Sequence, residues 1–149
     1  MIRKAKLTDA KEIQKLTKTF ADRGEMLPRS LIQIYENIRD FVVAWKDNEI
    51  VGVCALHVTW ENLAEIRTLA VAEKNHRAGT GSMLVEACLQ EARELEIKHV
   101  FALTYKPDFF KKQGFSIIDK SELPHKVWQD CLNCPKFPDC DEIAMRLNL

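Results

Sequence analysis

Two glycines at positions 79 and 81 lie between a predicted strand and a predicted amphipathic helix, and no other feature constrains the fold of this chain as strongly. The strand pattern covers residues 65–71, and the helix pattern carries a stripe of apolar side chains: Leu84, Cys88, Ala92 and Leu95. Because glycine has no Cβ, backbone N–H groups at the start of that helix can converge on an anion at the positive end of the helix dipole. The loop therefore predicts a site that would fit a diphosphate.

Other phosphate-binding loops do not match this segment. A dinucleotide-binding fingerprint needs a third glycine, and a Walker loop needs Gly-Lys-Ser/Thr, whereas this chain has Gly79-Thr80-Gly81-Ser82. A plain structural turn remains the alternative, because glycine pairs also make turns.

The remaining pattern is one of short strands and helices. We expect strands at 2–7, 41–45, 50–58, 65–71, 99–104, 115–118 and 143–147. Helices are expected after Thr8-Asp9, up to a break at Gly24; from Pro28 through Ile38; after Gly81; and over 107–113, stopped by Gly114. Asp47-Asn48 favours a tight turn between the second and third strands.

Length and charge limit the classes of function. A chain of 149 residues fits one domain, 1–149. Lys plus Arg and Asp plus Glu are both 22, so no positive surplus exists to bind nucleic acid or an anionic membrane. No secretory signal and no long apolar run is present, and the five cysteines are expected to be reduced, so we expect a cytoplasmic protein.

The order strand, glycine loop, amphipathic helix and strand, followed by Phe109-Phe110-Lys111-Lys112-Gln113-Gly114-Phe115, resembles the GNAT acetyltransferase family over nearly the whole chain. The resemblance implies a single α/β (α+β) domain with a mixed, mostly antiparallel central sheet flanked by helices. It also implies acetyl-CoA as co-substrate, with no metal required. The family's loop pattern is Arg/Gln-x-x-Gly-x-Gly/Ala, and here His76 leads, with Arg77 one residue late. The resemblance assigns cofactor contacts to Leu69, Ala70, Val71, His76, Arg77, Ala78, Gly79, Thr80, Gly81, Ser82 and Phe110.

A narrower similarity, to the acetyltransferase domain of the N-acetylglutamate synthases, lies in residues 24–30, 64–71, 103–104 and 123–124. It implies transfer of an acetyl group to the α-amine of glutamate, the first step toward arginine, by a short, stand-alone form. Arg29 and Arg67 are then expected to bind the substrate, since a guanidinium can clamp a carboxylate. The family's Arg-x-Ser element is absent from 137–141, where Lys136 or Lys126 could substitute. Surface ion pairing is the alternative for either arginine.

The resemblance also bears on the chemistry. Glu65 is the expected general base, acting through a water, or else a partner of a nearby arginine. Many GNAT enzymes protonate the departing thiolate with a tyrosine, but that position here is Phe110. Tyr105 or water is left for this role, and Tyr105 could equally serve in packing.

A cysteine cluster allows a separate hypothesis. His125, Cys131, Cys134 and Cys140 have the spacing His-x5-Cys-x2-Cys-x5-Cys, which suffices for a tetrahedral zinc site. A proline-rich surface loop with free thiols is the favoured interpretation, so no metal is expected.

Three functions compete at this level. The first is an enzyme that acetylates glutamate or a close anionic amino acid. The second is a GNAT enzyme for another small amine or for a peptide N-terminus. The third is a module that senses acetyl-CoA without turnover, which the phenylalanine at position 110 and the histidine at position 76 leave open. C-terminal strands would allow two copies to pair as a homodimer.

Overall fold

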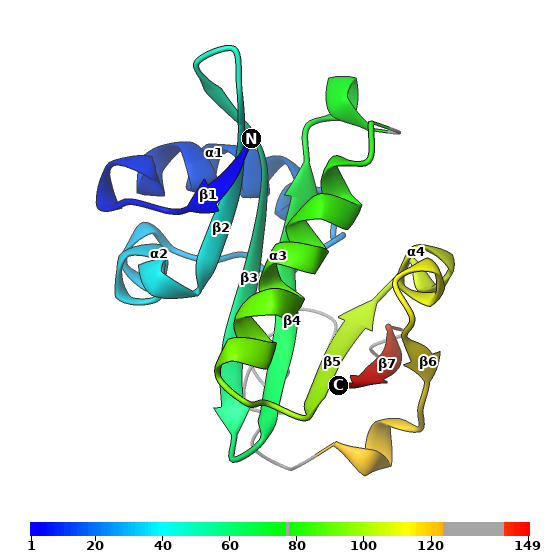
Figure 1. Cartoon of the computed structure of the whole chain (residues 1–149). Coiled ribbons are helices and arrows are strands. Elements are labelled where there is room, and N and C mark those ends of the chain that lie inside the picture. The colour runs from blue at the N-terminus through cyan, green and yellow to red at the C-terminus, as the bar shows by residue number, and fades with distance from the viewer. Residues whose placement is uncertain (77, 124–141) are drawn as a thin grey trace.

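The computed structural model describes residues 1–76, 78–123 and 142–149, which form a seven-stranded sheet in the order β1-β2-β3-β4-β5-β7-β6 (Figure 1). The strands are β1 (Ile2–Lys4), β2 (Phe41–Lys46), β3 (Glu49–Trp60), β4 (Leu63–Val71), β5 (His99–Thr104), β6 (Ser116–Ile117) and β7 (Ile143–Asn148). The α-helices are α1 (Ala10–Asp22), α2 (Leu31–Glu36), α3 (Thr80–Glu94) and α4 (Pro107–Lys112). Short 3-10 helices are η1 (Leu7–Asp9), η2 (Ile38–Asp40), η3 (Glu73–Asn75) and η4 (Lys120–Glu122). All strand pairs are antiparallel except β4 with β5, which confirms the predicted mixed sheet and α+β class.

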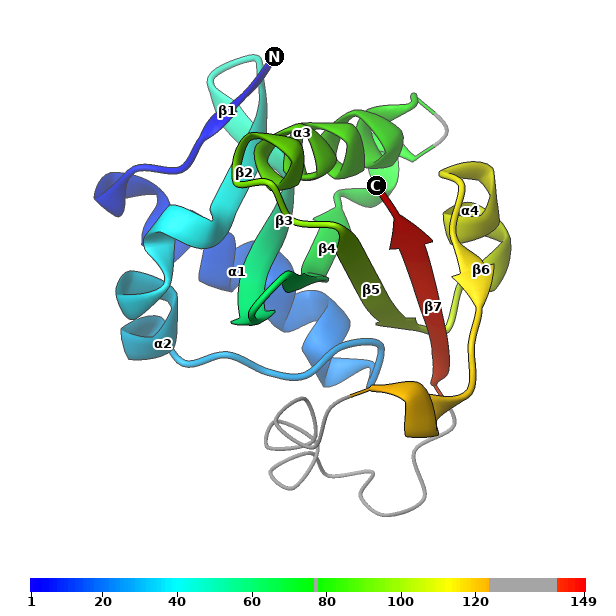
Figure 2. The same ribbon diagram turned by 60° about the horizontal axis from the view of Figure 1, so that its bottom comes forward.

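The sheet is covered on both faces. Helix α3 crosses one face, and α1 and α2 lie on the other (Figures 1 and 2). Residues alternate between the two faces along each strand. In β3, Cys54 and Leu56 pack toward α3, whereas Val53 and Ala55 pack toward α1 and α2.

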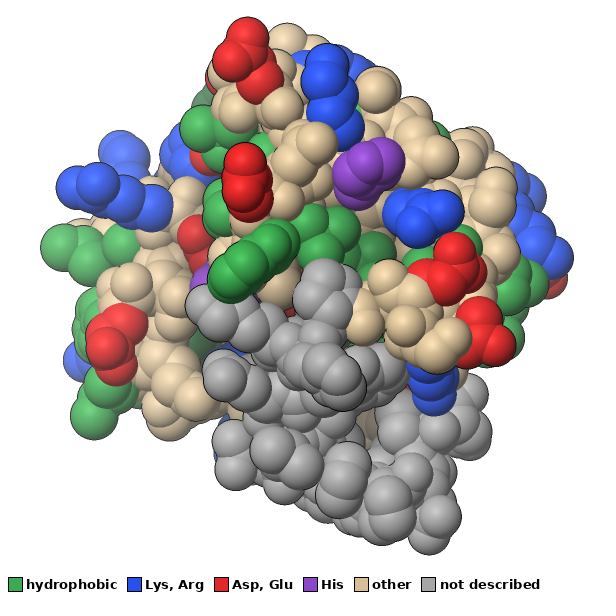
Figure 3. All heavy atoms as spheres, turned by 90° about the horizontal axis from the view of Figure 1, so that it is seen from below, with side chains coloured by type: hydrophobic (Ala, Val, Ile, Leu, Met, Phe, Trp, Pro, Cys, Tyr) green, Lys and Arg blue, Asp and Glu red, His purple; other side chains and the backbone are tan. Residues whose placement is uncertain are grey.

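Some hydrophobic side chains remain at the surface near the β3–β4 turn. Val58 and Trp60, in the last part of β3, are about half exposed. Figure 3 views the molecule from this end and shows hydrophobic side chains beside acidic and basic ones. Among the described residues, none of the helices combines the length and apolar character needed to cross a membrane.

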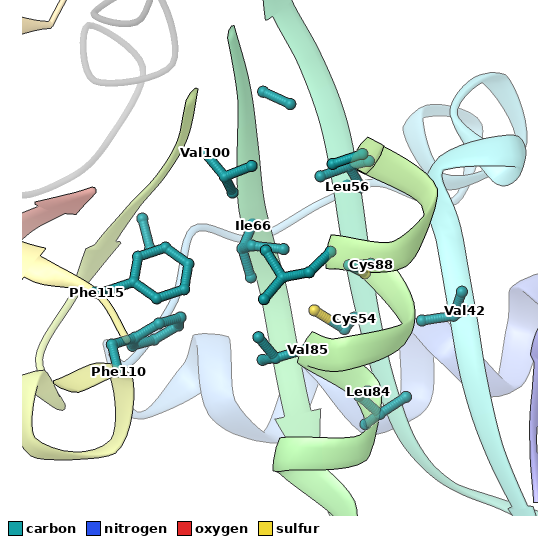
Figure 4. Close-up of a cluster of buried hydrophobic side chains, with 14 of the residues drawn as sticks. Val42, Cys54, Leu56, Ile66, Leu84, Val85, Cys88, Val100, Phe110 and Phe115 are labelled. Atoms are coloured by element: carbon teal, nitrogen blue, oxygen red, sulfur yellow. The ribbon is translucent and has the colours of Figure 1, made fainter. Parts of the chain in front are cut away.

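The core on the α3 face is formed by one stripe of the helix against β2, β3, β4, β5 and β7, and Figure 4 shows part of it. Leu84, Val85 and Cys88 of α3 are fully buried there. Cys54 and Cys88 are both free thiols, and their sulfur atoms lie close together in Figure 4. A hydrogen bond with Cys88, together with burial, raises the pKa of the Cys54 thiol well above its ordinary value. These two cysteines therefore pack as small apolar side chains in the core.

Strand β4 changes course in its middle. Its register with β3 shifts between Arg67 and Ala70, and Thr68 has a positive φ of 58°, which marks a β-bulge. Its parallel pairing with β5 covers only residues 63–65 against 99–101. Beyond Glu65 the two strands separate, toward the end of the sheet where α3 begins (Figure 1). The separation opens the sheet beside the glycine loop.

Local turn chemistry matches several predictions. Asp47 and Asn48 both have positive φ, of 51° and 62°, in the two-residue turn between β2 and β3. Gly24 (φ 73°) follows the end of α1, and Gly114 (φ 97°) follows the end of α4. Each glycine supplies the left-handed residue that ends a helix.

Two boundaries differ from the predictions, and one agrees. Strand β1 is shorter than 2–7, because η1 begins at Leu7. The first α-helix begins at Ala10, directly after Thr8-Asp9 as predicted. The second begins at Leu31 rather than near Pro28, because the Ser30 hydroxyl and the Gln33 side chain form a reciprocal capping box. In the C-terminal region, β7 lies between β5 and β6, so the last strand is not an open edge for a second copy.

Asp9 stabilises the N-terminal turn. Its carboxylate accepts hydrogen bonds from Arg3 at 2.8 and 3.1 Å and from the Lys6 amide at 2.7 Å, and its side chain is 7% exposed. These bonds, above all the one from Arg3, lower the pKa of Asp9 from its ordinary value of 3.8.

We expect Asp9→Asn to reduce the free energy of unfolding by about 2 kcal/mol at pH 7. In the wild type this stabilisation is complete above the ordinary pKa and is lost as the pH falls through the lowered pKa of the folded state. Urea unfolding at neutral and acidic pH measures both effects. Equal stability of the two proteins at pH 7 would contradict the assignment.

Candidate functional site

A large cleft follows the separation of β4 and β5. It has a volume of about 1140 Å³. Its walls come from the segment between α1 and α2, from β4, from the start of α3, from the end of β5 and from α4. The cleft can hold a long, thin ligand with one end at the glycine loop.

The glycine loop forms one end of this cleft. Gly79 caps α3 with φ 79°, and a Cβ there would meet no atom within 4 Å, so backbone conformation rather than space requires glycine. The Met83 amide donates a hydrogen bond to the Gly79 carbonyl at 3.1 Å, and this is the first hydrogen bond of the helix. The amides of Thr80, Gly81 and Ser82 come before it and therefore have no acceptor within α3. These three residues all line the cleft. A helix of 15 residues directs its positive end to this point.

Close packing explains the second glycine. A Cβ on Gly81 would lie 3.3 Å from two ring atoms of Phe109 in α4. A hydrogen bond of 2.9 Å from Gln113 Nε2 to Ser82 Oγ also joins α4 to the first turn of α3. Phe110 lines the cleft but is 5% exposed, with edge-to-face contacts to Phe109 and Phe115. Helices α3 and α4 thus meet directly at the loop.

The main chain of β4 after the bulge faces the cleft. The Ala72 amide bonds the Val51 carbonyl at 2.8 Å, so the main-chain groups of Val71, one residue earlier, point away from β3. His76 Nε2 donates a hydrogen bond to the Val71 carbonyl at 2.7 Å. Leu69 and Val71 line the cleft, and their side chains pack against the α3 core. Amides in this position can bond an extended, amide-containing ligand as a strand would.

Charged side chains line another part of the cleft, away from the glycine loop. Glu65 and Arg67 lie two residues apart on β4, on the face that α1 and α2 cover, with 4.0 Å between Arg67 Nη1 and Glu65 Oε1. Both side chains are largely buried. Arg29, before α2, lines the same cleft, and Arg29 and Arg67 also line a small adjoining cavity with Gln33, Asn37 and Asp40. Two guanidinium groups and one carboxylate are therefore brought together from distant parts of the sequence.

Polar groups also line the wall opposite β4. Tyr105 follows the end of β5 and lines the cleft. The neighbouring Thr104 hydroxyl accepts a hydrogen bond from the Lys106 amide at 2.8 Å. Asn75 is 7% exposed in the cleft wall, and its Oδ1 has no hydrogen-bond partner among the described residues. Such a buried acceptor can receive an N–H group of a ligand.

Several predicted residues lie elsewhere. Ala70 is 2% exposed and packs into the core beneath α1 and α2, because the bulge turns its side chain away from α3. Ala78 is exposed and is not among the residues that line the cleft. The predictions for Arg77, Lys136, His125, Cys131, Cys134 and Cys140 lie outside the described residues. Within 1–76, 78–123 and 142–149, no three His, Cys, Asp or Glu side chains are grouped to hold a metal.

Sequence reasoning missed part of the cleft wall. Arg23, after α1, forms an ion pair of 2.7 Å with Glu73 of η3, which joins the α1–α2 segment to the segment before the glycine loop. Phe20, Met26 and Leu27 also line the cleft and supply apolar surface to it. The interrupted helix pattern at Gly24 was the available signal that this segment turns back over the sheet.

The comparisons with known proteins agree with this geometry. The model of the acetyltransferase (GNAT) family matches residues 7–115. An uncharacterized N-acetyltransferase of Chlorobaculum tepidum is 44% identical over 97% of this chain and 93% of its own length. An amino-acid acetyltransferase of Mycobacterium tuberculosis is 35% identical over 87% of this chain and 76% of its own length. The crystal structure of N-acetylglutamate synthase from Neisseria gonorrhoeae, complexed with coenzyme A and N-acetyl-glutamate, superposes with a TM-score of 0.91 at 26% identity. That superposition covers 100% of this chain and 35% of the other.

Proposed function

The chain belongs to the GNAT acetyltransferase family and takes its acetyl group from acetyl-CoA, and we propose that it passes this group to the α-amine of glutamate or a close anionic amino acid. In this role it would catalyse the first step toward arginine, in the cytoplasm. The observation that carries the proposal is the convergence of Arg29, Arg67 and Glu65 at one part of the cleft.

The two arginines suit a dicarboxylate. A guanidinium binds a carboxylate through two parallel hydrogen bonds, and charge-assisted bonds of this kind are stronger inside a cleft than at an open surface. Arg29 comes from the segment before α2 and Arg67 from β4, and both line the cleft, so a small amino acid bound there could present one carboxylate to each. The amino-acid acetyltransferase and the N-acetylglutamate synthase among the relatives support the same acceptor class.

Cofactor placement follows from the loop. In this proposal the diphosphate of acetyl-CoA accepts hydrogen bonds from the amides of Thr80, Gly81 and Ser82. Pantetheine then runs along β4, bonded by the Leu69 and Val71 main chain, and brings the thioester to the part of the cleft that contains Glu65. The β4–β5 separation gives it room to reach that part.

The reaction is a direct acetyl transfer. An α-ammonium group is mostly protonated near pH 7, with a pKa of about 8 to 10 as a free amino acid. Glu65 removes one proton through a water, and the amine then attacks the thioester carbon. An N–C bond forms and the C–S bond breaks; the nitrogen gives its second proton to Tyr105 or water, and the same group supplies the proton that the thiolate takes up. Holding amine and thioester together supplies much of the rate, up to about 7 to 11 kcal/mol.

A product assay tests the acceptor. Purified protein is incubated with acetyl-CoA and each of a panel of amino acids, and the products are weighed by mass spectrometry. We expect N-acetylglutamate to form fastest. A different acetylated amino acid would refute the glutamate assignment, and acetylation of peptide N-termini alone would refute the amino-acid class.

Arg29→Ala tests the carboxylate clamp. We expect the KM for glutamate to rise by about 10-fold, because a charge-assisted hydrogen bond is lost. The KM for acetyl-CoA should stay the same. Arg93→Ala is the matched control, since Arg93 pairs with Glu86 on the outer surface of α3, and its KM values should match the wild type. An unchanged glutamate KM in Arg29→Ala would contradict the clamp.

A further inference from the structure

His57 and Asp40 form a hydrogen-bonded pair behind the charged part of the cleft. His57 Nδ1 lies 2.6 Å from Asp40 Oδ2, and the two side chains are 33% and 24% exposed. A carboxylate oxygen accepts, so the proton on this bond is carried by Nδ1. In the neutral ring this leaves the lone pair on Nε2, on the far side of the imidazole from Asp40. Asp40 thereby selects one tautomer of His57.

The sheet register places this pair next to Glu65. His57 of β3 lies directly opposite Glu65 of β4, and Ala55 lies opposite Arg67. Asp40 immediately precedes β2, on the other side of β3. Side chains directly opposite in an antiparallel pair have Cβ atoms about 4.5 to 5.5 Å apart. Asp40, His57 and Glu65 therefore form a row from the residue before β2, across β3, to β4, with Arg67 two residues from Glu65, on the face that α1 and α2 cover.

Only the β4 end of this row reaches the large cleft. Glu65 and Arg67 line the large cleft, whereas His57 and Asp40 are not among its lining residues. Asp40 instead lines the small cavity that Arg29 and Arg67 share. His57 is thus placed to act on the substrate through Glu65 and not by contact.

We propose that the Asp40–His57 pair positions Glu65 and takes on the proton that Glu65 removes from the amine. The ammonium group loses one proton to the Glu65 carboxylate, and the resulting carboxylic acid passes it to Nε2 of His57. Asp40 stabilises the imidazolium that forms, and the partly exposed ring releases the proton to water. The carboxylate of Glu65 is restored for the next turnover. This inference rests on the proposed role of Glu65 as the base.

The pair should therefore affect turnover and not cofactor binding. We expect His57→Phe to lower kcat by about 10-fold, which is less than the loss expected for removing a general base itself, because Glu65 remains in place. The KM for acetyl-CoA should stay within about twofold, since binding of the cofactor uses other parts of the cleft. Asp40→Asn should also lower kcat. The asparagine amide can donate a hydrogen bond to Nδ1, which stabilises the tautomer with the proton on Nε2, and that ring cannot accept a proton from Glu65.

A double-mutant cycle of His57→Phe and Glu65→Gln tests the proposal. If His57 acts through Glu65, His57→Phe should change kcat by less than about twofold in the Glu65→Gln background. His99→Phe is the matched control, because His99 forms a similar pair, with Nδ1 2.8 Å from Asn148 Oδ1, away from the cleft. Its kcat should equal that of the wild type.

Two results would overturn the proposal. One is a wild-type kcat in His57→Phe, with or without a lower Tm, which would reduce the pair to a structural role. The other is an equal loss in both backgrounds, which would show that His57 does not act through Glu65. The cycle is run with whichever amine the wild type acetylates, so a wrong acceptor is detected in the wild-type product and does not affect this test.

Discussion

Glu65→Gln is expected to reduce kcat by about 100- to 10,000-fold, the range for loss of a general base. The amide keeps the size of the side chain and one acceptor, but it cannot take a proton from the amine. Its place on β4, 4.0 Å from the Arg67 guanidinium, should be retained. Steady-state release of CoA thiol measures kcat, and calorimetric titration with CoA should give the wild-type affinity.

Glu25→Gln is the control for this prediction. Glu25 lines the same cleft, but it comes from the α1–α2 segment and its side chain is 42% exposed beside Arg23. Its kcat should change by less than about threefold, as expected for a surface ion pair. A Glu65→Gln enzyme that retained more than a third of the wild-type kcat would remove Glu65 as the base.

Gly79→Ala is expected to raise the KM for acetyl-CoA by about 30-fold. An alanine at φ 79° costs about 1 to 2 kcal/mol, although its methyl group would meet no neighbouring atom. The chain relieves this strain by changing φ, which turns the amides of Thr80 and Gly81 away from the diphosphate. Initial rates over a range of acetyl-CoA concentrations measure the effect.

Gly114→Ala separates strain from function. Gly114 has φ 97° in the turn after α4, and a Cβ there would lie 3.4 Å from Leu147 Cδ1. The Gly114→Ala variant should lose about as much free energy of unfolding as Gly79→Ala, yet it should keep the wild-type KM for acetyl-CoA. If both variants lost stability and neither changed the KM for acetyl-CoA, the glycine loop at position 79 would be only a structural turn.

Local signals made much of the fold predictable. The Asp47-Asn48 turn, the glycines that end α1 and α4, and the strand-loop-helix order around Gly79 all depend on residues close together in sequence. Ser30 and Gln33 carried an equally local signal, a Ser-x-x-Gln capping box, which shows that Pro28 was the weaker marker of a helix start.

The remaining features depend on contacts between distant segments. Nothing in the composition of β4 indicates that Thr68 takes a positive φ, yet the bulge sends Ala70 into the core and helps to separate β4 from β5. The His57–Asp40 pair joins residues 17 positions apart through the β2–β3 register. No signal in the sequence near His57 indicates Asp40 as its partner.

The site itself was only partly predictable. Arg29 and Arg67 were singled out through family resemblance, and their approach to one cleft depends on how the segment before α2 folds back over the sheet. By contrast, the first-turn amides of α3 follow from the sequence, because any helix has unsatisfied N–H groups at its start and two glycines expose them.

A crystal structure with bound CoA would show whether the main-chain amides at the start of α3 hold the diphosphate. We expect diphosphate oxygens within hydrogen-bond distance of the Thr80, Gly81 and Ser82 amides, with the thiol directed along β4 toward Glu65. Electron density for CoA at any other place, with those amides bonded within the protein, would contradict it.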